Sequence, residues 1–452
     1  MIGWLRAQLV DALQDLQIDT GHVLLERPRQ SQHGDLSTNA PLVYADQAGQ
    51  PPMKLAEALQ AHLSLDPGMI ARVEVAPPGF LNFVMADEFL RRHLLTAMEQ
   101  GEKYGRSTLG AGKRALVEFV SVNPTGPLTV GHGRNAVLGD TVSNILAWNG
   151  YTVEREYYYN DAGRQMRLLG ESVQARYREV QGLEADFPEG GYEGDYIRDI
   201  AAAIAGSEDL APEDAGDVMP FTTAAEKAIF ADIRDTLERL GVTLDHYFNE
   251  HVLYESDALN KVIAALKKKR LAYEKDGATW LKASRLGRAD DRVLIKQSGE
   301  PTYRLPDIAY HADKLDRGFD LVVDLFGADH QETYPDVLAG LQGLGYDTGN
   351  IRVLIHQFVT LTQGGKKVKM STRKATFVTL EELIAKVGRD VTRYFFIMRT
   401  MNSHLQFDLE LAAKTSEENP VYYLQYAHAR IANIIKHAHA SGYAVDPSQA
   451  NL

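Results

Sequence analysis

The sequence predicts an α/β protein built around a doubly wound parallel sheet. The apolar run from Ala115 to Val122 has the length of a strand, and it leads into a Pro/Gly loop and then a helical pattern after Gly131. A second strand, Val153 to Tyr159, follows that helix, and Asp320 to Phe326 is an apolar run typical of a buried strand. Strands that alternate with helices indicate a parallel sheet with helices on both faces.

A small α+β domain is expected ahead of this sheet, at residues 1–108. Leu5, Leu9 and Leu13 recur at helical spacing and open the domain with an amphipathic helix. The other expected elements are helices at 53–63 and 89–98, strands at 72–75 and 81–84, a polar loop at 30–39 and a linker at 101–112.

The sheet domain is expected to span residues 109–400. An acidic stretch at about 181–220 breaks the alternation, and we interpret it as an insertion between the two halves of the sheet. The second half is expected to start near Arg292–Ile295 and to continue with strands at 320–326 and 352–361. The expected helices lie at 222–240, 256–271, 380–387 and 391–398, and Asp161 is the expected N-cap of the helix after the second strand. A long helix after Asn419 belongs to a C-terminal segment, 401–452.

Composition limits the classes of function. The 452 residues include no cysteine, which excludes disulfides and thiolate-bound zinc. No apolar run reaches membrane-spanning length, and Met1–Trp4 leads into an amphipathic pattern rather than a signal peptide, so the expected compartment is the cytoplasm. The net charge of -13 does not favour general affinity for nucleic acid. An RNA partner would need local basic patches, such as Lys267–Arg270 or Lys366–Lys374, although such runs are more often solvated faces.

The crossing from strand to helix at Glu118–Asp140 is the strongest candidate for chemistry. Backbone N–H groups and the positive end of the helix dipole meet at a helix N-terminus, which suits a phosphate. Gly131 has no Cβ, so a flat ring such as adenine can lie against its backbone, and His132 can donate to phosphate oxygens. An ordinary strand-to-helix turn would show the same features. A second crossing, Gly327–Gln331, is expected to face the same crevice, because open α/β sheets bind ligands at the carboxyl ends of their strands.

Two short motifs resemble the signatures of a known family. Thr129-Val130-Gly131-His132 resembles the His-Ile-Gly-His signature of class I aminoacyl-tRNA synthetases, and the preceding residues 123–128 resemble the form found in arginyl-tRNA synthetase. Lys369-Met370-Ser371-Thr372 resembles the second signature, Lys-Met-Ser-Lys-Ser. Both motifs depart from the general pattern, since Thr129 replaces the first His and Thr372 replaces the second Lys.

The resemblance covers most of the chain. Residues 33–39 and 78–83 resemble the extra N-terminal domain of arginyl-tRNA synthetase, which touches the elbow of the tRNA. Residues 419–430 resemble the opening of its helical anticodon-binding domain. That domain is expected to be incomplete, because a domain takes at least about 50 residues and the sequence ends at Leu452.

The family implies a Rossmann-type catalytic domain that uses ATP as a substrate, with Mg²⁺, and needs no zinc or other protein-bound metal. The implied partners are L-arginine and its cognate tRNA, with no membrane association, and the implied state is a monomer. Members of the family generally need bound tRNA before they activate arginine.

The resemblance also implies roles for single residues. The carboxylate of the amino acid attacks the α-phosphorus of ATP, so the protein must position the reactants and stabilise the charge that develops. The two signature loops, 123–133 and 364–375, are expected to do this. The residues expected in catalysis are His132, Thr129, Lys369, Arg373 and Lys374. The residues expected at ATP are Pro124, Thr125, Gly126, Gly131, His132, Gly327, Asp329, His330, Met370 and Ser371.

An arginine pocket is implied as well. A carboxylate accepts a guanidinium bidentately, and the pocket of the family combines a Tyr and an Asp four residues apart with a Gln further on. The residues expected at arginine are Glu118, Ser121, Asn123, Tyr303, Asp307 and Gln331. Taken singly, Asp307 is better explained as a helix-start residue beside a proline, Tyr303 as a strand aromatic and Gln331 as a surface residue.

Three interpretations of the sequence stay open. The first is an arginine–tRNA ligase. The second is another adenylate-forming or nucleotidyl-transferring enzyme of the same superfamily, against which the N-terminal domain and the set of Tyr303, Asp307 and Gln331 argue. The third is an RNA-binding or regulatory relative without catalysis, which Thr129 and the short C-terminal segment favour.

Overall fold

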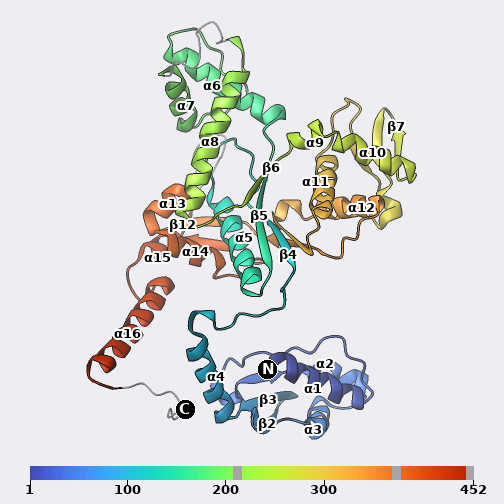
Figure 1. The fold of residues 1–452 in the computed structure, drawn as a ribbon, viewed down its shortest axis with the longest axis vertical. Helices are drawn as coiled ribbons and strands as arrows, with labels where there is room; N and C mark the ends of the chain where they lie inside the picture. Colours follow the sequence, from blue (N-terminus) through green and yellow to red (C-terminus); the bar gives the residue numbers. More distant parts are fainter. Residues whose placement is uncertain (207–215, 369–377, 444–452) are drawn as a thin grey trace. The chain divides into compact units, whose positions relative to one another are not determined.

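The computed structural model describes residues 1–206, 216–368 and 378–443, and the chain divides into two compact units (Figure 1). One unit comprises Met1–Gly105 with Ala432–Leu452, and the other comprises Arg106–Ile431. None of the helices in the described ranges combines the length and the apolarity needed to cross a lipid bilayer.

The first unit packs helices against a small antiparallel sheet. Helix α1 buries Leu5, Leu9 and Leu13 completely, as their spacing predicts. The sheet has the order β1-β3-β2, and the turn at residues 77–79 joins β2 to β3. Helix α2 lies where no helix was expected. The elements are α1 (Ile2–Asp15), β1 (Leu36–Thr38), α2 (Ala40–Ala48), α3 (Pro52–His62), β2 (Ile70–Ala76), β3 (Phe80–Met85) and α4 (Asp87–Gln100).

The second unit is organised by a parallel sheet, for which the described residues supply five strands in the order β11-β10-β4-β5-β6. The chain runs outward from β4 to β6 and then returns to β10 and β11 on the other side. This order is that of a doubly wound sheet, so the expected fold class is confirmed. The strands are β4 (Arg114–Glu118), β5 (Thr152–Tyr159), β6 (His246–Asn249), β10 (Leu321–Gly327) and β11 (Ile351–His356).

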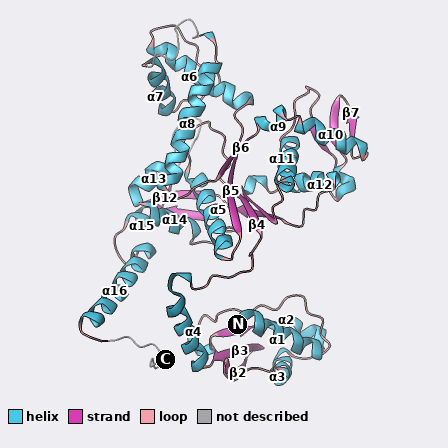
Figure 2. Ribbon diagram, viewed as in Figure 1, coloured by secondary structure: helices cyan, strands magenta, loops and turns pink. Residues whose placement is uncertain are grey.

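Helices cover both faces of this sheet, as Figure 2 shows for the cyan helices around the magenta strands. Neighbouring residues of β4 point to opposite faces, because side chains alternate along a strand. Leu116 packs into the core with α10, α11 and α12, whereas Val117 packs into the core with α5, α6 and α8. The helices of the second unit are α5 (Val130–Trp148), α6 (Gly163–Val180), α7 (Asp195–Ala205), α8 (Met219–Arg239), α9 (His251–Glu255), α10 (Ala258–Lys268), α11 (Arg304–Asp316), α12 (Tyr334–Leu344), α13 (Leu380–Val387), α14 (Arg389–Ile397) and α15 (Leu409–Ala413), and α16 (Pro420–Ala440) starts in this unit.

Two expectations about the second half of the sheet are wrong. The run Arg292–Ile295 is β9, which pairs antiparallel with β8 (Ala278–Leu281) in a separate sheet that also contains β7 (Ala272–Lys275). A four-residue apolar run does not show which sheet its strand joins. The strand expected at 352–361 is in fact two strands, because the chain leaves the parallel sheet after His356 and starts β12 (Val359–Gln363) in another sheet, which also holds β14 (Leu405–Asp408).

The second signature loop begins with a tight hairpin. Gly364 and Gly365 both have positive φ, at 58° and 70°, and they join β12 to β13 (Lys366–Lys367). Two consecutive residues with positive φ are what a type I′ hairpin turn requires, and glycine meets this requirement without strain. The rest of the expected loop, from residue 369 to 375, lies outside the described residues.

Candidate functional site

The site lies at the carboxyl edge of the parallel sheet, where β4 and β10 are direct neighbours. The loop at residues 119–129 leaves β4 and enters α5, and the segment Gly327–Gln331 leaves β10 and enters α12. Since β4 and β10 belong to the two halves of the sheet, this position is the topological switch point, where open α/β sheets bind their ligands.

The N-terminus of α5 is closed by a reciprocal cap. Thr129 is the N-cap, and its hydroxyl accepts a hydrogen bond from the backbone N–H of His132 at 3.4 Å. In return, Nδ1 of His132 accepts from the backbone N–H of Thr129 at 3.1 Å. Thr129 therefore has a structural role at this helix end that the sequence interpretation did not include, although Thr is among the preferred N-cap residues.

Burial sets the charge of His132, and the cap sets its tautomer. Burial, together with the nearby His356, lowers the pKa of His132 to about 4. The ring is therefore neutral at pH 7, and because Nδ1 accepts a hydrogen bond, Nε2 carries the proton. His132 can act as a neutral hydrogen-bond donor to a phosphate oxygen, but it does not bring a positive charge.

Glycines along α5 serve two different purposes. A Cβ at Gly139 would lie 2.1 Å from the ring of Phe119, and one at Gly133 would lie 2.5 Å from Leu380, so packing against the protein requires both glycines. A Cβ at Gly131 would meet only the hydroxyl of Thr129, at 3.6 Å. Packing within the described residues does not require a glycine at 131, and the open space beside its backbone can accept a ligand.

The backbone directly after β4 is strained. Val120 and Ser121 have φ values of 68° and 45°, a left-handed conformation that is rare for a β-branched residue. The side chain of Asn135 holds this bend, since Oδ1 accepts from the N–H of Val120 at 2.7 Å and Nδ2 donates to the carbonyl of Leu325 at 3.1 Å. Asn135 thereby ties the ends of β4 and β10 together. Backbone strain of this kind clusters at functional sites.

Arg134 anchors the same helix end to more distant segments. Its side chain is fully buried and donates to the backbone carbonyls of Gln357, Thr400 and Ser403 at 2.6–3.1 Å. These carbonyls belong to the turn before β12 and the turn before β14. Arg134 therefore fixes the start of α5 against the sheet that carries the second signature loop.

A buried ion-pair network lies beneath the strained bend. The ammonium of Lys314 on α11 is completely buried and donates to both Glu118 and Asp324. His311 contacts the same Asp324 at 3.2 Å. Burial would raise the pKa of Asp324, but Lys314 and His311 outweigh it and hold that pKa well below its usual range. Glu118 also accepts from the hydroxyl of Ser121 at 2.8 Å, so two of the expected arginine contacts lie together.

Asp307 differs from the other acids of this region. It is partly buried on the first turn of α11, and within the described ranges its carboxylate has neither a hydrogen-bond nor an ion-pair partner. Burial raises the pKa of Asp307 to about 7; His311 and Lys314 lower it, whereas Glu118 and Glu250 raise it. An unpaired acid surrounded by other acids is a site that a cation would complete.

Glu250, which follows β6, is a member of the acidic region that the sequence interpretation missed. It is buried, and it accepts from the hydroxyl of Tyr158 and from Nδ2 of Asn160 at 2.8 Å. The backbone N–H of Asn160 donates to Oδ1 of Asn123 at 3.0 Å, which connects this acid to the first signature loop. Asn123 thus lies at the edge of the acidic region.

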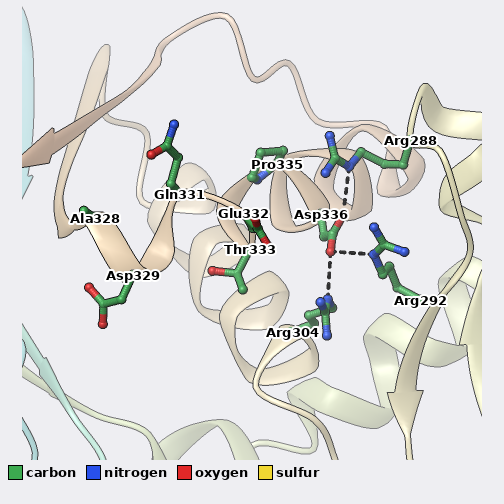
Figure 3. Close-up of a pocket in the computed structure, with 10 residues that line it drawn as sticks. All are labelled: Arg288, Arg292, Arg304, Ala328, Asp329, Gln331, Glu332, Thr333, Pro335 and Asp336. Atoms are coloured by element: carbon green, nitrogen blue, oxygen red, sulfur yellow. Dashed lines mark hydrogen bonds and ion pairs between the residues drawn. The ribbon is translucent and has the colours of Figure 1, made fainter.

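The structure does not bring Tyr303 and Gln331 into this enclosed region. The side chain of Tyr303 is 82% exposed at the start of α11. Gln331 is also exposed and lines a separate cavity of about 850 Å³ with Asp329, Arg288, Arg292 and Arg304 (Figure 3). The three side chains expected to surround a guanidinium therefore do not form one closed pocket in this structure.

The remaining expected ATP contacts lie around the same edge of the sheet. Asp329 and His330 are exposed after Gly327, and the His330 ring stacks on Phe326 with a centroid distance of 5.2 Å. The turn at Pro124-Thr125-Gly126 is held by Tyr196 of α7, whose hydroxyl donates to the carbonyl of Thr125 at 2.8 Å. The other expected contacts lie outside the described residues: Lys369, Met370, Ser371, Arg373 and Lys374.

The expected N-cap at Asp161 is wrong. Ala162 is the N-cap of α6, and its N–H bonds to the side chain of Asn160. Asp161 instead accepts from Nδ2 of Asn249 at 2.6 Å and contacts Nδ1 of His251 at 3.0 Å. The side chain of Asn160 therefore stabilises the turn before α6. The side chain of Asp161 connects the end of β5 to the end of β6.

Two clusters of acids and histidine have the spacing of metal ligands within the described residues. They are Glu118, His311 and Asp324, and Glu154, Glu156 and His246. Lys314 donates to two acids of the first cluster, and Arg317 donates to the two acids of the second. In each cluster, the side chain of a lysine or arginine already neutralises the acids that a metal ion would bind. We therefore assign no metal to either cluster.

Comparison with known proteins places this geometry in context. The family model described as "tRNA synthetases class I (R), catalytic domain" matches residues 93–433, and the model "Arginyl tRNA synthetase N terminal domain" matches residues 4–85. The arginine–tRNA ligase of Salinibacter ruber is 51% identical over 467 aligned residues, which cover 99% of this chain and 83% of that protein. The arginine–tRNA ligase of Desulfotalea psychrophila is 51% identical over 415 residues, which cover 92% of this chain and 75% of that protein.

The solved structure of Thermus thermophilus arginyl-tRNA synthetase has the same fold. It superimposes with a TM-score of 0.74 over 99% of this chain and 83% of that chain. The two sequences are 21% identical, so this likeness concerns the fold alone.

Proposed function

This chain belongs to the arginyl-tRNA synthetase family, and on that premise we propose that it is an arginine–tRNA ligase. It activates L-arginine with ATP to arginyl-adenylate and pyrophosphate, and then transfers arginine to the 3′ end of the cognate tRNA. The two family domains in their order, and relatives at about half identity over nearly the whole chain, support this proposal.

One observation in the structure supports arginine as the amino acid. Asp307 is a partly buried carboxylate that has no hydrogen-bond or ion-pair partner in the part of the chain that the structure describes, and it lies next to the acids Glu118 and Glu250. A guanidinium would supply the missing donors and neutralise a charge that the fold leaves unpaired. Glu118, Ser121 and Asn123 are proposed to line the same pocket. Tyr303 and Gln331 remain proposed contacts on the resemblance alone.

The phosphates of ATP are proposed to lie at the N-terminus of α5. Gly131 leaves space beside the backbone, and His132 presents its Nε2–H as a neutral donor. The carboxylate of arginine would attack the α-phosphorus, and these groups would stabilise the charge that develops on the phosphoryl oxygens. Because His132 is neutral, positive charge must come from elsewhere, and Lys369, Arg373 and Lys374 are the proposed source. ATP is used with Mg²⁺, to which we assign no ligand among the described residues.

The partner of the second step is tRNA. The N-terminal unit, expected at residues 1–108, is proposed to contact the tRNA, as the extra domain of the family does. Residues 401–452 are proposed to be the stem and the start of the helical anticodon-binding domain. The proposed compartment is the cytoplasm and the proposed oligomeric state is a monomer, both by analogy with the family.

Pyrophosphate exchange tests the proposal against its alternatives. The purified chain is incubated with ATP, labelled pyrophosphate and each standard amino acid, with and without tRNA. We expect exchange with arginine only, and a higher rate when tRNA is present. Exchange driven by another amino acid would identify a different ligase, and no exchange with any amino acid in the presence of tRNA would indicate a relative without catalysis.

A further inference from the structure

Three arginines converge on one buried carboxylate beside the candidate site. Asp336 of α12 is fully buried, and Nε of Arg288, Arg292 and Arg304 donates to it at 2.8, 2.9 and 2.9 Å. Figure 3 shows the three guanidinium groups meeting at Asp336 on one side of the cavity. The arginines come from three different elements: the loop before β9, the first residue of β9 and the first residue of α11.

The cluster carries more positive charge than Asp336 can balance. Burial would raise the pKa of Asp336, but the hydrogen bonds from Arg304, Arg288 and Arg292 outweigh it, so the carboxylate is ionised. One negative charge then faces three guanidinium groups. Arg292 has a further acid, Asp290, at 3.8 Å, but the side chain of Asp290 is 81% exposed. Glu332 and Asp329 also line the cavity, and both are exposed to water, where charges are strongly screened.

The geometry of the three hydrogen bonds leaves donors available. Each arginine reaches Asp336 through Nε, so the two terminal nitrogens of each guanidinium are not used in that contact. Nη1 of Arg292 donates to the backbone carbonyl of Asp291 at 3.5 Å, whereas the terminal nitrogens of Arg288 and Arg304 have no hydrogen-bond partner among the described residues. The side chains of the three arginines are only 26–29% exposed. Their hydrogen bonds to Asp336 hold them at the wall of a cavity of about 850 Å³. A single arginine would have sufficed to pair a buried aspartate.

Fixed and partly desolvated guanidinium groups match the oxygens of a phosphate. We propose that this cavity binds a phosphodiester group of an RNA strand. The identity of the RNA as tRNA rests on the proposed function. A net charge of -13 gives the chain no general attraction for RNA, so contact requires local sites of this kind. The cavity includes Gln331, which follows the end of β10, so a bound strand would lie at the sheet edge where the adenylate is proposed to form.

The substitution Arg288→Gln tests this site while leaving Asp336 two partners. Binding of the full chain to tRNA is measured as a function of salt, with Arg239→Gln as the matched control. Arg239 is also partly exposed, but two acids, Asp235 and Glu381, already pair with it. We expect Arg288→Gln to weaken binding about tenfold and to lower the slope of log K against log salt by about 0.7–0.9, the contribution of one phosphate. Arg239→Gln should match the wild type.

Two further variants separate this site from a purely structural cluster. Arg288→Lys keeps the charge but not the planar fork, so it should restore the salt slope while affinity stays below the wild type. Arg304→Gln gives the same test as Arg288→Gln if the latter reduces the yield of folded protein. Unchanged affinity and salt slope in folded Arg288→Gln and Arg304→Gln would overturn the proposal.

The source of the phosphate is tested with free anions. Inorganic phosphate and pyrophosphate are added to the wild type and to Arg288→Gln while the melting temperature is followed. Stabilisation that depends on Arg288, together with unchanged tRNA binding by the variant, would show a site for free anions and overturn the proposal. If the wild type binds tRNA with an Arg288-dependent slope but exchanges no pyrophosphate with arginine, the proposed function fails and the RNA site stands.

Discussion

The carboxylate of Asp307, which has no partner among the residues that the structure describes, leads to a prediction with opposite effects on stability and on activity. Burial raises the pKa of Asp307 from 3.8 to about 7. One pKa unit corresponds to about 1.4 kcal/mol, so the ionised side chain costs the folded protein at most about 4 kcal/mol. An acid whose pKa is raised on folding destabilises the fold as it ionises. The cost is therefore absent below about pH 4 and complete above about pH 7.

Asp307→Asn removes this cost. In the absence of arginine, the variant should melt a few degrees above the wild type at pH 8, and the difference should vanish near pH 4. Arginine should stabilise the wild type and not the variant. The variant should lose a factor of a hundred or more in kcat/KM for arginine activation, since a broken buried pair costs about 3–5 kcal/mol.

The matched control is Asp324→Asn, an identical change in the same region. Asp324 is paired with Lys314 and His311, so its loss leaves a buried ammonium with one acid fewer and should destabilise the protein by about 3–5 kcal/mol. The reasoning about Asp307 is refuted if Asp307→Asn lowers the melting temperature at pH 8, or if it keeps near-normal kinetics with arginine.

Four further variants test the first signature loop and the elements that hold it. Gly131→Ala should leave stability within about 0.5 kcal/mol and raise the KM for ATP, whereas Gly139→Ala, which clashes with a core ring, should cost about 1–3 kcal/mol in a melting or urea experiment. Tyr196→Phe should slow adenylate formation about fivefold, because it removes a hydrogen bond of about 1 kcal/mol that holds the loop; stopped-flow or exchange kinetics measure this. Thr129→His should destabilise the protein by about 1 kcal/mol through loss of the N-cap, and equal stability of this variant would contradict the capping role.

Part of the site could be predicted from the sequence, because turn residues and apolar spacing indicate where strands end and helices begin. Pro124, Gly126 and Pro127 indicate that a strand has ended, and the apolar spacing after Gly131 indicates a helix, so the crossing of β4 into α5 could be predicted from neighbouring residues alone. The expected strand end at Val122 is wrong, because β4 ends at Glu118 and the backbone is left-handed at Val120 and Ser121. In the same way as for the first crossing, the apolar run that ends at Phe326 and the glycine after it predict where β10 ends. A doubly wound sheet then brings the two crossings together without any knowledge of side-chain contacts.

Other parts depend on contacts between distant residues. Glu250 follows β6, a four-residue strand whose composition gives no clear signal, and two of its partners, Tyr158 and Asn160, lie about 90 residues earlier in the chain. Lys314 resembles a surface lysine until folding brings Glu118, 196 positions away, to its ammonium. Arg134 donates to backbone carbonyls more than 220 residues away, which no sequence motif encodes.

Thr129 has a role that the comparison of motifs did not reveal. Compared with the family signature, it looks like the loss of a histidine that contacts ATP. In the structure its hydroxyl caps α5 and its backbone N–H fixes the ring of His132. The N-cap preference of threonine was available in the sequence, but the signature drew attention to the side chain as a phosphate ligand.

The most direct test of the central claim is the charging of tRNA with arginine compared with citrulline. Citrulline has nearly the shape of arginine, but its side chain is uncharged and presents an oxygen where arginine presents a donor. If Asp307 and its acidic neighbours select the guanidinium, arginine should be attached to cognate tRNA at least about a hundredfold more efficiently than citrulline. Charging of citrulline within about tenfold of arginine, or charging of another standard amino acid in its place, would contradict the account.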